Sequence, residues 1–316
     1  MVVVKGLEAE TTVHVPVFVA EVIEAFKLTS AVTFLDATIG GGGHARAILK
    51  AFPEANLWGM DRDPYAIERV AKYLPQHRVH LCNDNFSQLD RLPQKTFDGI
   101  LFDFGLSSDQ LNIPERGFSF RSDGPLDMRM DPTKGISAAQ FLNTAPREVL
   151  AQAIRDFGEE PHWRRIVDAI WNARGTNRLD RTSAFAELVR NALPKYHYGK
   201  IDPATRTFQG IRIAVNGELE AIQMALPKAF TALAPGGVLA AISFHSLEDR
   251  LVKQFFRQWA GLPITRWDGR SKDERQRPLG KMQTTKPITP SAAEIAANPR
   301  SRSAKLRVFQ KGGACP

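Results

Sequence analysis

The sequence contains few cysteines, and the two that it has, Cys82 and Cys315, lie far apart. They cannot form the framework of several disulfides that is typical of small secreted proteins, and they do not show the spacing of a zinc site. A reducing compartment fits this composition best. We therefore expect a cytoplasmic protein without a bound metal.

Long apolar segments are also missing. No run approaches the roughly 18 residues needed to cross a bilayer, and residues 1–10 do not combine a basic stretch with an apolar one. We therefore expect neither a membrane span nor a secretory signal.

The chain is long and its charge is unevenly distributed. Its 316 residues suffice for two domains, and its formal net charge is +8. Residues 250–316 hold 15 Lys and Arg against 4 Asp and Glu, a net +11, which leaves −3 for the rest. A basic segment of this kind indicates a polyanionic partner such as nucleic acid, although a solvated basic surface explains it equally well.

The first hundred residues predict alternating strands and helices. Apolar runs predict strands at residues 32–37, 56–61, 78–83 and 97–104. Asp63 followed by Pro64 predicts a helix start. Strands separated by helices indicate an α/β fold, with a parallel sheet covered on both faces.

The pattern changes after Gly105. Residues 106–135 are loop-like, and residues 136–202 show only helical periodicity, which predicts an inserted helical unit. One long amphipathic helix follows over residues 211–233, where Pro227 should kink or divide it. A turn at 234–237, a strand at 238–244 and a final edge strand at 306–310 complete the prediction.

Four consecutive glycines, residues 40–43, follow the first predicted strand and precede a helix. Glycines allow a sharp turn and close approach to a ligand, and the helix start offers free N–H groups. Gly40-x-Gly42-x-x-Ala45 matches the dinucleotide fingerprint. Asp36-x-Thr38-x-Gly40-x-Gly42 matches the acidic, glycine-rich loop of S-adenosylmethionine (SAM) enzymes. A tight turn without a ligand is the third interpretation.

Two aspartates help to choose between these cofactors. Asp36 would have a Coulombic role beside the ammonium group of a methionine moiety, but none beside a pyrophosphate. Asp61, at the end of the second predicted strand, suits ribose hydroxyls in either cofactor class. Its alternative role as a helix cap is better filled by Asp63.

The ends of the next two strands supply further candidates. Phe86 either flanks an adenine ring or belongs to the core. Asp103 lies where ligands of open α/β sheets bind, so we expect it to be functional. The loop at residues 117–131 either forms a substrate wall or buries Phe118, Phe120, Met128 and Met130.

At these positions the chain resembles the RsmH (MraW) family of bacterial SAM-dependent methyltransferases. The matching strings cover most of the chain: Gly42-Gly43-His44, Asp61-Arg62-Asp63-Pro64, and residues 14–17, 103–110, 115–120, 124–131, 205–209, 212–216, 219–220, 243–250 and 298–303. There are mild departures from the family pattern. Asp109 stands where proline is usual, and Ala37 and Ala45 replace residues that are commonly Gly and Ser.

The resemblance implies a Rossmann-like class I SAM-dependent methyltransferase domain, residues 1–135 with 203–316, which carries an inserted helical domain, residues 136–202, on the substrate side. It implies methyl transfer from SAM to the N4 amine of a cytidine in 16S rRNA, free or in the small ribosomal subunit. It leaves open whether the protein is a monomer or a homodimer. The family's cofactor positions fall on Gly42, Gly43, His44, Asp61, Phe86, Asp103 and Gln110, to which the residue pattern adds Asp36 and Gly40.

The catalytic residues are less constrained. Because the lone pair of a cytosine amine is delocalised, the enzyme mainly has to position that amine, and an oxygen acceptor for its proton would help. We consider Asp103, Ser107 and His245 as candidates, although His245 equally suits a helix cap or a core hydrogen bond.

Other residues are candidates for contact with RNA. Arg206, Arg212 and Asn216 lie on one side of the long helix, where they face RNA or the cleft, or are simply solvated. Trp259 and Trp267 lie in the basic segment that we expect to contact phosphates. An NAD-dependent oxidoreductase and a non-catalytic RNA-binding protein remain the rival classes.

Overall fold

The computed structural model describes residues 16–30, 32–194, 202–264 and 277–313. Trp267 and the last part of the predicted insertion, residues 195–201, lie outside the described residues.

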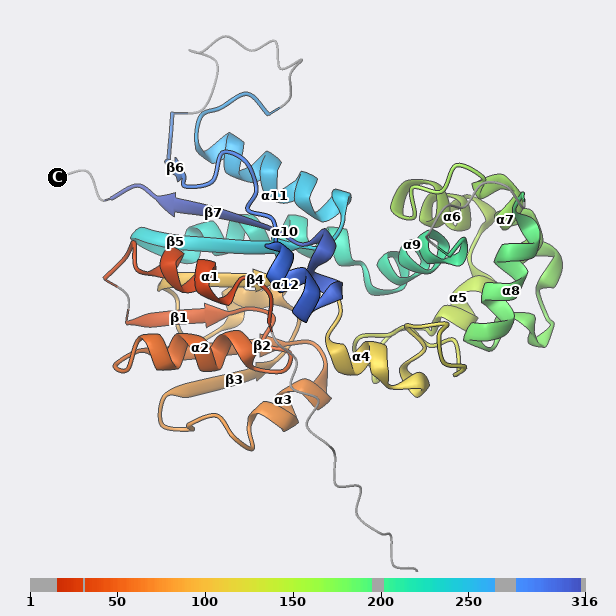
Figure 1. Ribbon diagram of the computed structural model, residues 1–316, viewed down its shortest axis with the longest axis horizontal. Coiled ribbons are helices and arrows are strands. Elements are labelled where there is room, and N and C mark those ends of the chain that lie inside the picture. Colours follow the sequence, from red (N-terminus) through yellow and green to blue (C-terminus); the bar gives the residue numbers. More distant parts are fainter. Residues whose placement is uncertain (1–15, 31, 195–201, 265–276, 314–316) are drawn as a thin grey trace, which may run out of the picture.

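A seven-stranded sheet with the order β3-β2-β1-β4-β5-β7-β6 forms the centre of the α/β part (Figure 1). Its strands are β1 (Thr33–Asp36), β2 (Asn56–Asp61), β3 (Val79–Asn83), β4 (Phe97–Asp103), β5 (Leu233–Ser243), β6 (Gly280–Met282) and β7 (Lys305–Lys311). β1 to β5 pair in parallel, whereas β7 is antiparallel to β5 and β6. From β1 the chain builds β2 and β3 on one side and β4 and β5 on the other, so β1 and β4 flank a topological switch point. The predicted α/β class is confirmed.

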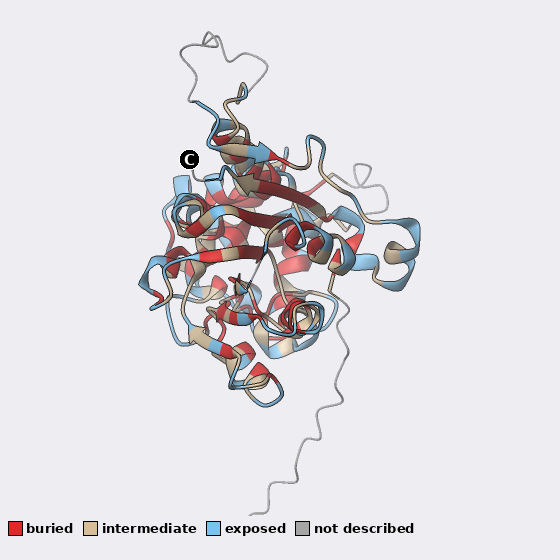
Figure 2. Ribbon diagram, turned by 90° about the vertical axis from the view of Figure 1, so that its left-hand side faces the viewer, coloured by how far each residue is buried: buried red, intermediate tan, exposed pale blue. Residues whose placement is uncertain are grey.

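Helices cover both faces of this sheet. α1 (Val19–Phe26) and α2 (Gly43–Ala51) pack on one face, and η1 (Phe86–Arg91), α10 (Glu218–Ala232) and α11 (Ser246–Trp259) pack on the other. α3 (Pro64–Val70) begins as predicted, because the side chain of Asp63 accepts a hydrogen bond from the backbone N–H of Tyr65. Figure 2 shows that the central strands are largely buried.

The single long helix predicted over residues 211–233 is wrong. The chain forms α9 (Ala204–Asn216) and α10, and it breaks at Gly217, whose φ is +60°, rather than at Pro227. Asn216 explains the position of the break. Its side chain accepts from the N–H of Met130 and donates to the carbonyl of Met128, which fixes the end of α9 against that loop. Pro227 lies inside α10.

The C-terminal strand also differs from its prediction. β7 includes residues 306–310 but lies between β5 and β6, so it is not an edge strand. The turn predicted at 234–237 lies within β5, where the pairing with β4 jumps from Leu233 to Val238.

A helical unit lies to one side of the sheet (Figure 1). It contains α5 (Ala138–Thr144), α6 (Arg147–Gln152), η3 (Ala153–Phe157), α7 (Trp163–Ala173), η4 (Asn177–Leu179) and α8 (Thr182–Ala192). Its hydrophobic core also takes in Phe118, Leu126 and Phe208, which lie outside the predicted range 136–202. α9 packs on η3, α5 and α8, and therefore belongs to this unit.

Short elements complete the fold: α4 (Ser108–Asn112), η2 (Pro114–Arg116), α12 (Ala292–Ala297) and η5 (Pro299–Ser303). Among the helices of the described residues, none has the length and apolar character required to span a membrane.

Candidate active site

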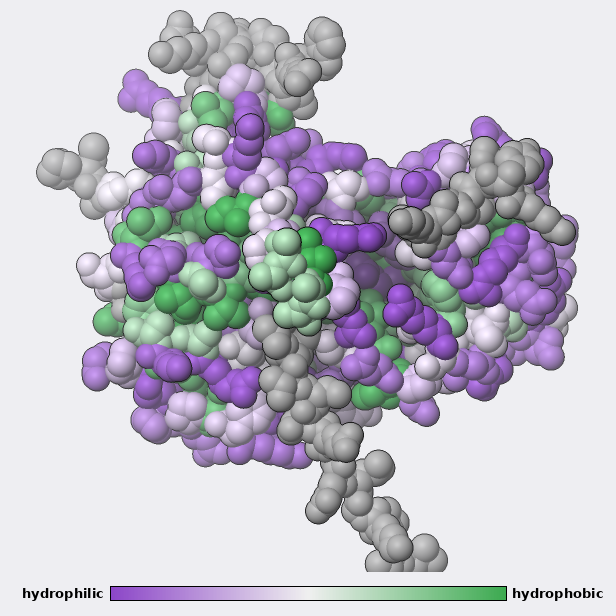
Figure 3. Space-filling model, in the orientation of Figure 1, coloured by the Kyte–Doolittle hydropathy of each residue, from purple (hydrophilic) through white to green (hydrophobic). Residues whose placement is uncertain are grey.

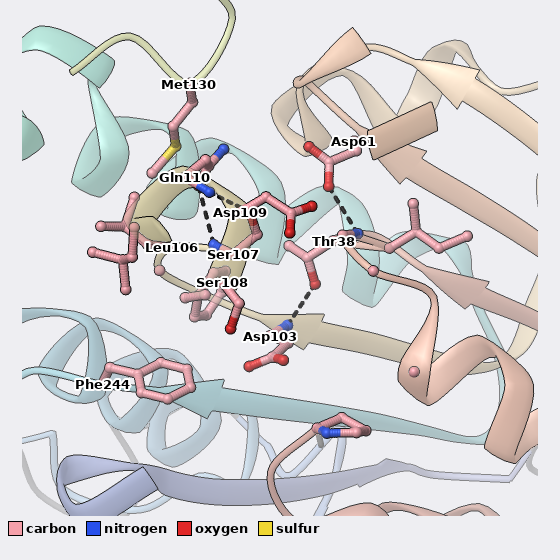
Figure 4. A pocket seen from close by; sticks show the side chains of 18 of the residues that line it. Thr38, Asp61, Asp103, Leu106, Ser107, Ser108, Asp109, Gln110, Met130 and Phe244 are labelled. Atoms are coloured by element: carbon pink, nitrogen blue, oxygen red, sulfur yellow. Dashed lines mark hydrogen bonds between the residues drawn. The ribbon is translucent and has the colours of Figure 1, made fainter. Parts of the chain in front are cut away.

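A cavity of about 950 Å³ lies at the carboxyl ends of the central strands. Figure 4 shows Asp61 and Thr38 on one side of Asp103, and Leu106, Met130 and Phe244 on the other. In the space-filling view, the surface is hollowed between the α/β part and the helical unit (Figure 3). A cavity of this size holds a nucleotide-sized ligand with further room beside it.

The loop between β1 and α2 forms one wall. Gly40, Gly41, Gly43 and His44 line the cavity. Gly42 is absent from the lining, but it has a φ of +68°, and a Cβ atom there would lie 2.7 Å from the Tyr73 hydroxyl. Gly42 therefore shapes the loop, and its predicted contact with the cofactor stays a prediction.

Asp61 ties this loop to the end of β2. One carboxylate oxygen accepts from the N–H of Gly40 at 2.9 Å, and the other accepts from the N–H of Asp63 at 2.9 Å. Burial raises the pKa of Asp61 to about 6, although these two hydrogen bonds favour the ionised form. Since each carboxylate oxygen has a second lone pair, Asp61 can still accept from a ligand in the cavity that it lines.

Asp36 lies beneath the loop and is not among the residues that line the cavity. It accepts from the N–H of Thr38 at 3.2 Å. Burial raises its pKa to about 7, although nearby His44 opposes this shift. Asp36 therefore holds the loop through the backbone of Thr38, and its interaction with the ammonium group of a methionine moiety stays a prediction.

Asp103 ends β4 in the middle of the site. Its N–H donates to the hydroxyl of Thr38 at 2.7 Å, and its Oδ2 lies 3.5 Å from Nε2 of buried His44. Burial alone would lower the pKa of His44, but the carboxylates of Asp103 and Asp36 outweigh burial and raise it. The other oxygen, Oδ1 of Asp103, is buried and has no hydrogen-bond partner among the described residues. Asp103 lines the cavity, so its carboxylate can meet a donor on a ligand once the side chain rotates.

Phe86, Ser107 and Gln110 also line the cavity. Ser107 and Gln110 form a capping box that starts α4. The side-chain amide of Gln110 donates to Asp63 at 3.1 Å, so Gln110 connects the loop after β4 to the end of β2. Phe86 combines both predicted roles, since its ring packs against Phe102 and Phe104 in the core while it lines the cavity.

His245 is not among the lining residues. It is the N-cap residue of α11, with Nε2 3.0 Å from Oε1 of fully buried Glu248. Glu248 accepts in turn from the N–H groups of Phe244 and His245. Burial would raise the pKa of Glu248, but His245 and Arg212 outweigh it and lower that pKa. The imidazole makes no cap hydrogen bond, so this geometry favours a core interaction with Glu248 at the start of α11.

Glu218 was missed by the sequence reasoning. It lines the cavity and pairs with Arg212, which the sequence had placed on the side facing RNA or the cleft. Glu218, His245 and Glu248 bring their ligating atoms within 4.8 Å of one another, as a metal site would. Arg212 pairs with Glu218, and the His245 imidazole lies beside Glu248.

The contact of the basic C-terminal segment with phosphates stays a prediction. Trp259 is buried in the core against Phe230 and Phe309, so its ring is not exposed for contact with RNA. Arg300 lines the cavity instead, and it donates to Ser108 at 3.0 Å and to Asn112 at 2.8 Å. The string at residues 298–303 was the signal that could have indicated this role.

The loop at residues 117–131 largely buries its apolar side chains. Phe118, Met128 and Met130 are buried, and Phe120 packs on Phe208. Met130 also lines the cavity, so one residue of this loop reaches the candidate site.

Comparisons with known proteins agree with this geometry. The family model described as the MraW methylase family matches residues 11–312. "Ribosomal RNA small subunit methyltransferase H" of Granulibacter bethesdensis is 44% identical over 315 residues, which cover 96% of this chain and 93% of that protein. The protein of the same name from Nitrosococcus oceani is 45% identical over 317 residues, with coverages of 96% and 98%.

Similarity to solved structures is weaker. A putative rRNA methylase from Clostridium thermocellum is 12% identical with a TM-score of 0.44, over 95% of this chain and 100% of that one. A putative methyltransferase from Streptococcus mutans in complex with SAH is 10% identical with a TM-score of 0.43, over 94% and 99%. The assignment of the chain therefore depends on the sequence matches and the strand order. Because the family model and both relatives span nearly the whole chain, the protein belongs to the MraW methylase family.

Proposed function

We propose that this protein transfers a methyl group from SAM to the exocyclic N4 amine of a cytidine in 16S rRNA, either free or within the small ribosomal subunit. The observation that carries the proposal is a single cavity lined by the glycine loop, Asp61 and Asp103. The names of the relatives support ribosomal RNA of the small subunit as the substrate. Such a substrate also favours a cytoplasmic location.

The residues present fit SAM. Asp61 accepts hydrogen bonds from the ribose hydroxyls, Phe86 offers an apolar surface to the adenine, and the loop at Gly40 and Gly41 permits close approach. When bound, SAM supplies an electrophilic methyl group on its sulfonium sulfur. An NAD-dependent oxidoreductase is less well supported, because the carboxylate of Asp103 would lie in a site for an anionic pyrophosphate.

Asp103 and Ser107 act on the acceptor amine in this proposal. The carboxylate of Asp103, which lines the cavity, accepts a hydrogen bond from the amine, and this bond orients the nitrogen and increases its electron density. The hydroxyl oxygen of Ser107 accepts from the backbone N–H of Gln110 at 3.3 Å and keeps a second lone pair that can accept from the amine. Their contribution is mainly to position a weak nucleophile. His245 supports α11 and Glu248 from outside the cavity.

The helical unit lies on the substrate side of the cavity in this proposal. The surface is hollowed between that unit and the sheet, which gives a folded RNA room to approach (Figure 3). A cytidine inside a helix would have to leave its stack to bring its amine into the cavity.

Transfer of a labelled methyl group to small-subunit RNA tests the function. We expect label in 16S rRNA when SAM is the donor, and loss of one N4-methylated cytidine from cells that lack the protein. SAM binding without transfer to free RNA or to assembled subunits would favour a non-catalytic RNA-binding protein. Tight NAD binding without SAM binding would favour the oxidoreductase.

A further inference from the structure

Two charged side chains on the cavity wall have no part in the function proposed above. Arg212, near the end of α9, and Glu218, the first residue of α10, both line the cavity. Two nitrogens of Arg212 donate to the two oxygens of Glu218, each at 2.8 Å. The side chains are only 15% and 7% exposed, so they form a nearly buried, bidentate ion pair.

This ion pair keeps hydrogen-bonding capacity toward the cavity. A carboxylate accepts at about four lone-pair positions, of which Arg212 occupies two. No residue in the described part of the chain accepts from the remaining terminal nitrogen of Arg212. Burying two charges costs free energy unless their remaining groups also find partners. The pair therefore presents an acceptor and a donor, side by side, to a ligand.

The pair lies on the side of the cavity where the methyl acceptor is expected. Glu218 is close to His245 and Glu248, which follow β5. Asp61, the proposed ribose acceptor, ends β2, and β1 and β4 lie between these two strands. Arg212 belongs to α9, which packs within the helical unit, on the side of the cavity proposed for the substrate. Arg62, the residue after Asp61, donates to the carbonyl of Asn216 at 2.8 Å, so the pair lies above the sheet between the ends of β2 and β5.

We infer that Glu218 and Arg212 read the base edge of the target cytosine, an inference that rests on the function proposed above. Glu218 accepts one N4 hydrogen, and the free nitrogen of Arg212 donates to N3. Uracil presents O4 and N3–H at these positions, so acceptor would face acceptor and donor would face donor. The pair selects cytosine over uracil by leaving buried groups of the wrong base unpaired.

Glu218→Gln tests this selection, because an amide donates as well as accepts and therefore tolerates O4. Methyl transfer is measured with full-length protein on small subunits that carry the target cytidine, in competition with subunits that carry uridine there. We expect cytidine subunits to compete at least about tenfold better in the unaltered protein, since one specific base contact contributes about 1–3 kcal/mol. In the glutamine variant this ratio should fall to within about threefold, with SAM affinity unchanged within about twofold.

Asp90→Asn is the matched control. Asp90 lies on η1 and forms an ion pair at 2.7 Å with Lys228, which is on α10 like Glu218. Neither residue of this pair lines the cavity. This variant should keep both the competition ratio and the SAM affinity. If Glu218→Gln does not fold, Arg212→Gln combined with Glu218→Gln removes both buried charges and should give the same loss of discrimination.

Two results would overturn the inference. One is an active Glu218→Gln variant that keeps the tenfold ratio. The other is a loss of SAM affinity that parallels the loss of rate, which would place the pair against the cofactor. Absence of methyl transfer by the unaltered protein would contradict the proposed function instead.

Discussion

The carboxylate of Asp61 holds the amide of Gly40 at 2.9 Å, so the end of β2 fixes the loop that leaves β1. The residue proposed to bind the ribose thus also shapes the glycine loop. A change at Asp61 should therefore affect both the contact with the ligand and the geometry of the glycine loop.

Replacing Asp61 by Ala should weaken SAM binding by about 10- to 100-fold. The change removes an ionised acceptor, and a hydrogen bond to a charged group contributes about 1.5–3 kcal/mol. Titration calorimetry with SAM measures the effect. Asp61→Asn keeps the shape of the side chain, so its affinity for SAM should lie between those of the unaltered protein and the alanine variant. Unchanged affinity in the alanine variant would remove the ribose assignment.

SAM affinity should also depend on pH through Asp61. Because burial raises its pKa to about 6, the carboxylate is ionised above that pH and becomes protonated below it. Affinity should therefore be level above pH 7 and decrease by up to about tenfold per unit well below pH 6. Asp61→Asn should flatten this decrease. If the asparagine variant keeps the same slope, another group is responsible, such as Asp36, whose pKa burial raises to about 7.

Gly42→Ala should destabilise the fold more than an alanine at an open glycine. Its φ of +68° disfavours a side chain, and the new Cβ would also meet the Tyr73 hydroxyl at 2.7 Å. We expect a loss of about 2–4 kcal/mol in urea unfolding, together with weaker SAM binding. Gly175→Ala is the matched control, since its φ is +73° with nothing within 4 Å, and it should lose only about 1–2 kcal/mol. Equal losses in both variants would contradict the close packing of Gly42.

Asp103→Asn should lower kcat by at least about 100-fold, because an amide is a weaker acceptor for the amine proton than a carboxylate. SAM affinity should change much less. His245→Gln should retain most of the rate per folded molecule, since His245 lies at the start of α11 outside the cavity lining. Single-turnover kinetics separate the chemical step from binding. If Asp103→Asn keeps the full rate while a folded His245→Gln variant is inactive, His245 rather than Asp103 has the catalytic role.

The sequence predicts the sheet better than it predicts the site. β2 has the predicted bounds because an apolar run there ends directly before a strong helix start at Asp63 and Pro64. The break between α9 and α10 was placed wrongly because it depends on a long-range contact of Asn216 with the loop at Met128 and Met130. Proline alone does not interrupt α10, whose Ile222, Leu226 and Ala229 are buried against the sheet.

The ion pair between Arg212 and Glu218 could not be predicted from the sequence, because it also depends on the break at Gly217. Residues six apart point in directions about 120° apart around an unbroken helix and lie about 9 Å apart along its axis. Only the break at Gly217 brings the two side chains together. The burial of Asp36 below the loop likewise depends on neighbouring strands rather than on its local sequence.

The break at Gly217 also marks the boundary between the helical unit and the α/β part. Arg212 belongs to α9, which packs within the helical unit, whereas Glu218 belongs to α10, which packs on η1, α11 and β5. Their ion pair therefore bridges the corner between the unit proposed to meet the RNA and the sheet proposed to hold SAM. Any rotation at this corner would pull the guanidinium away from the carboxylate. The polar wall of the cavity is complete only while the helical unit and the α/β part keep their relative orientation.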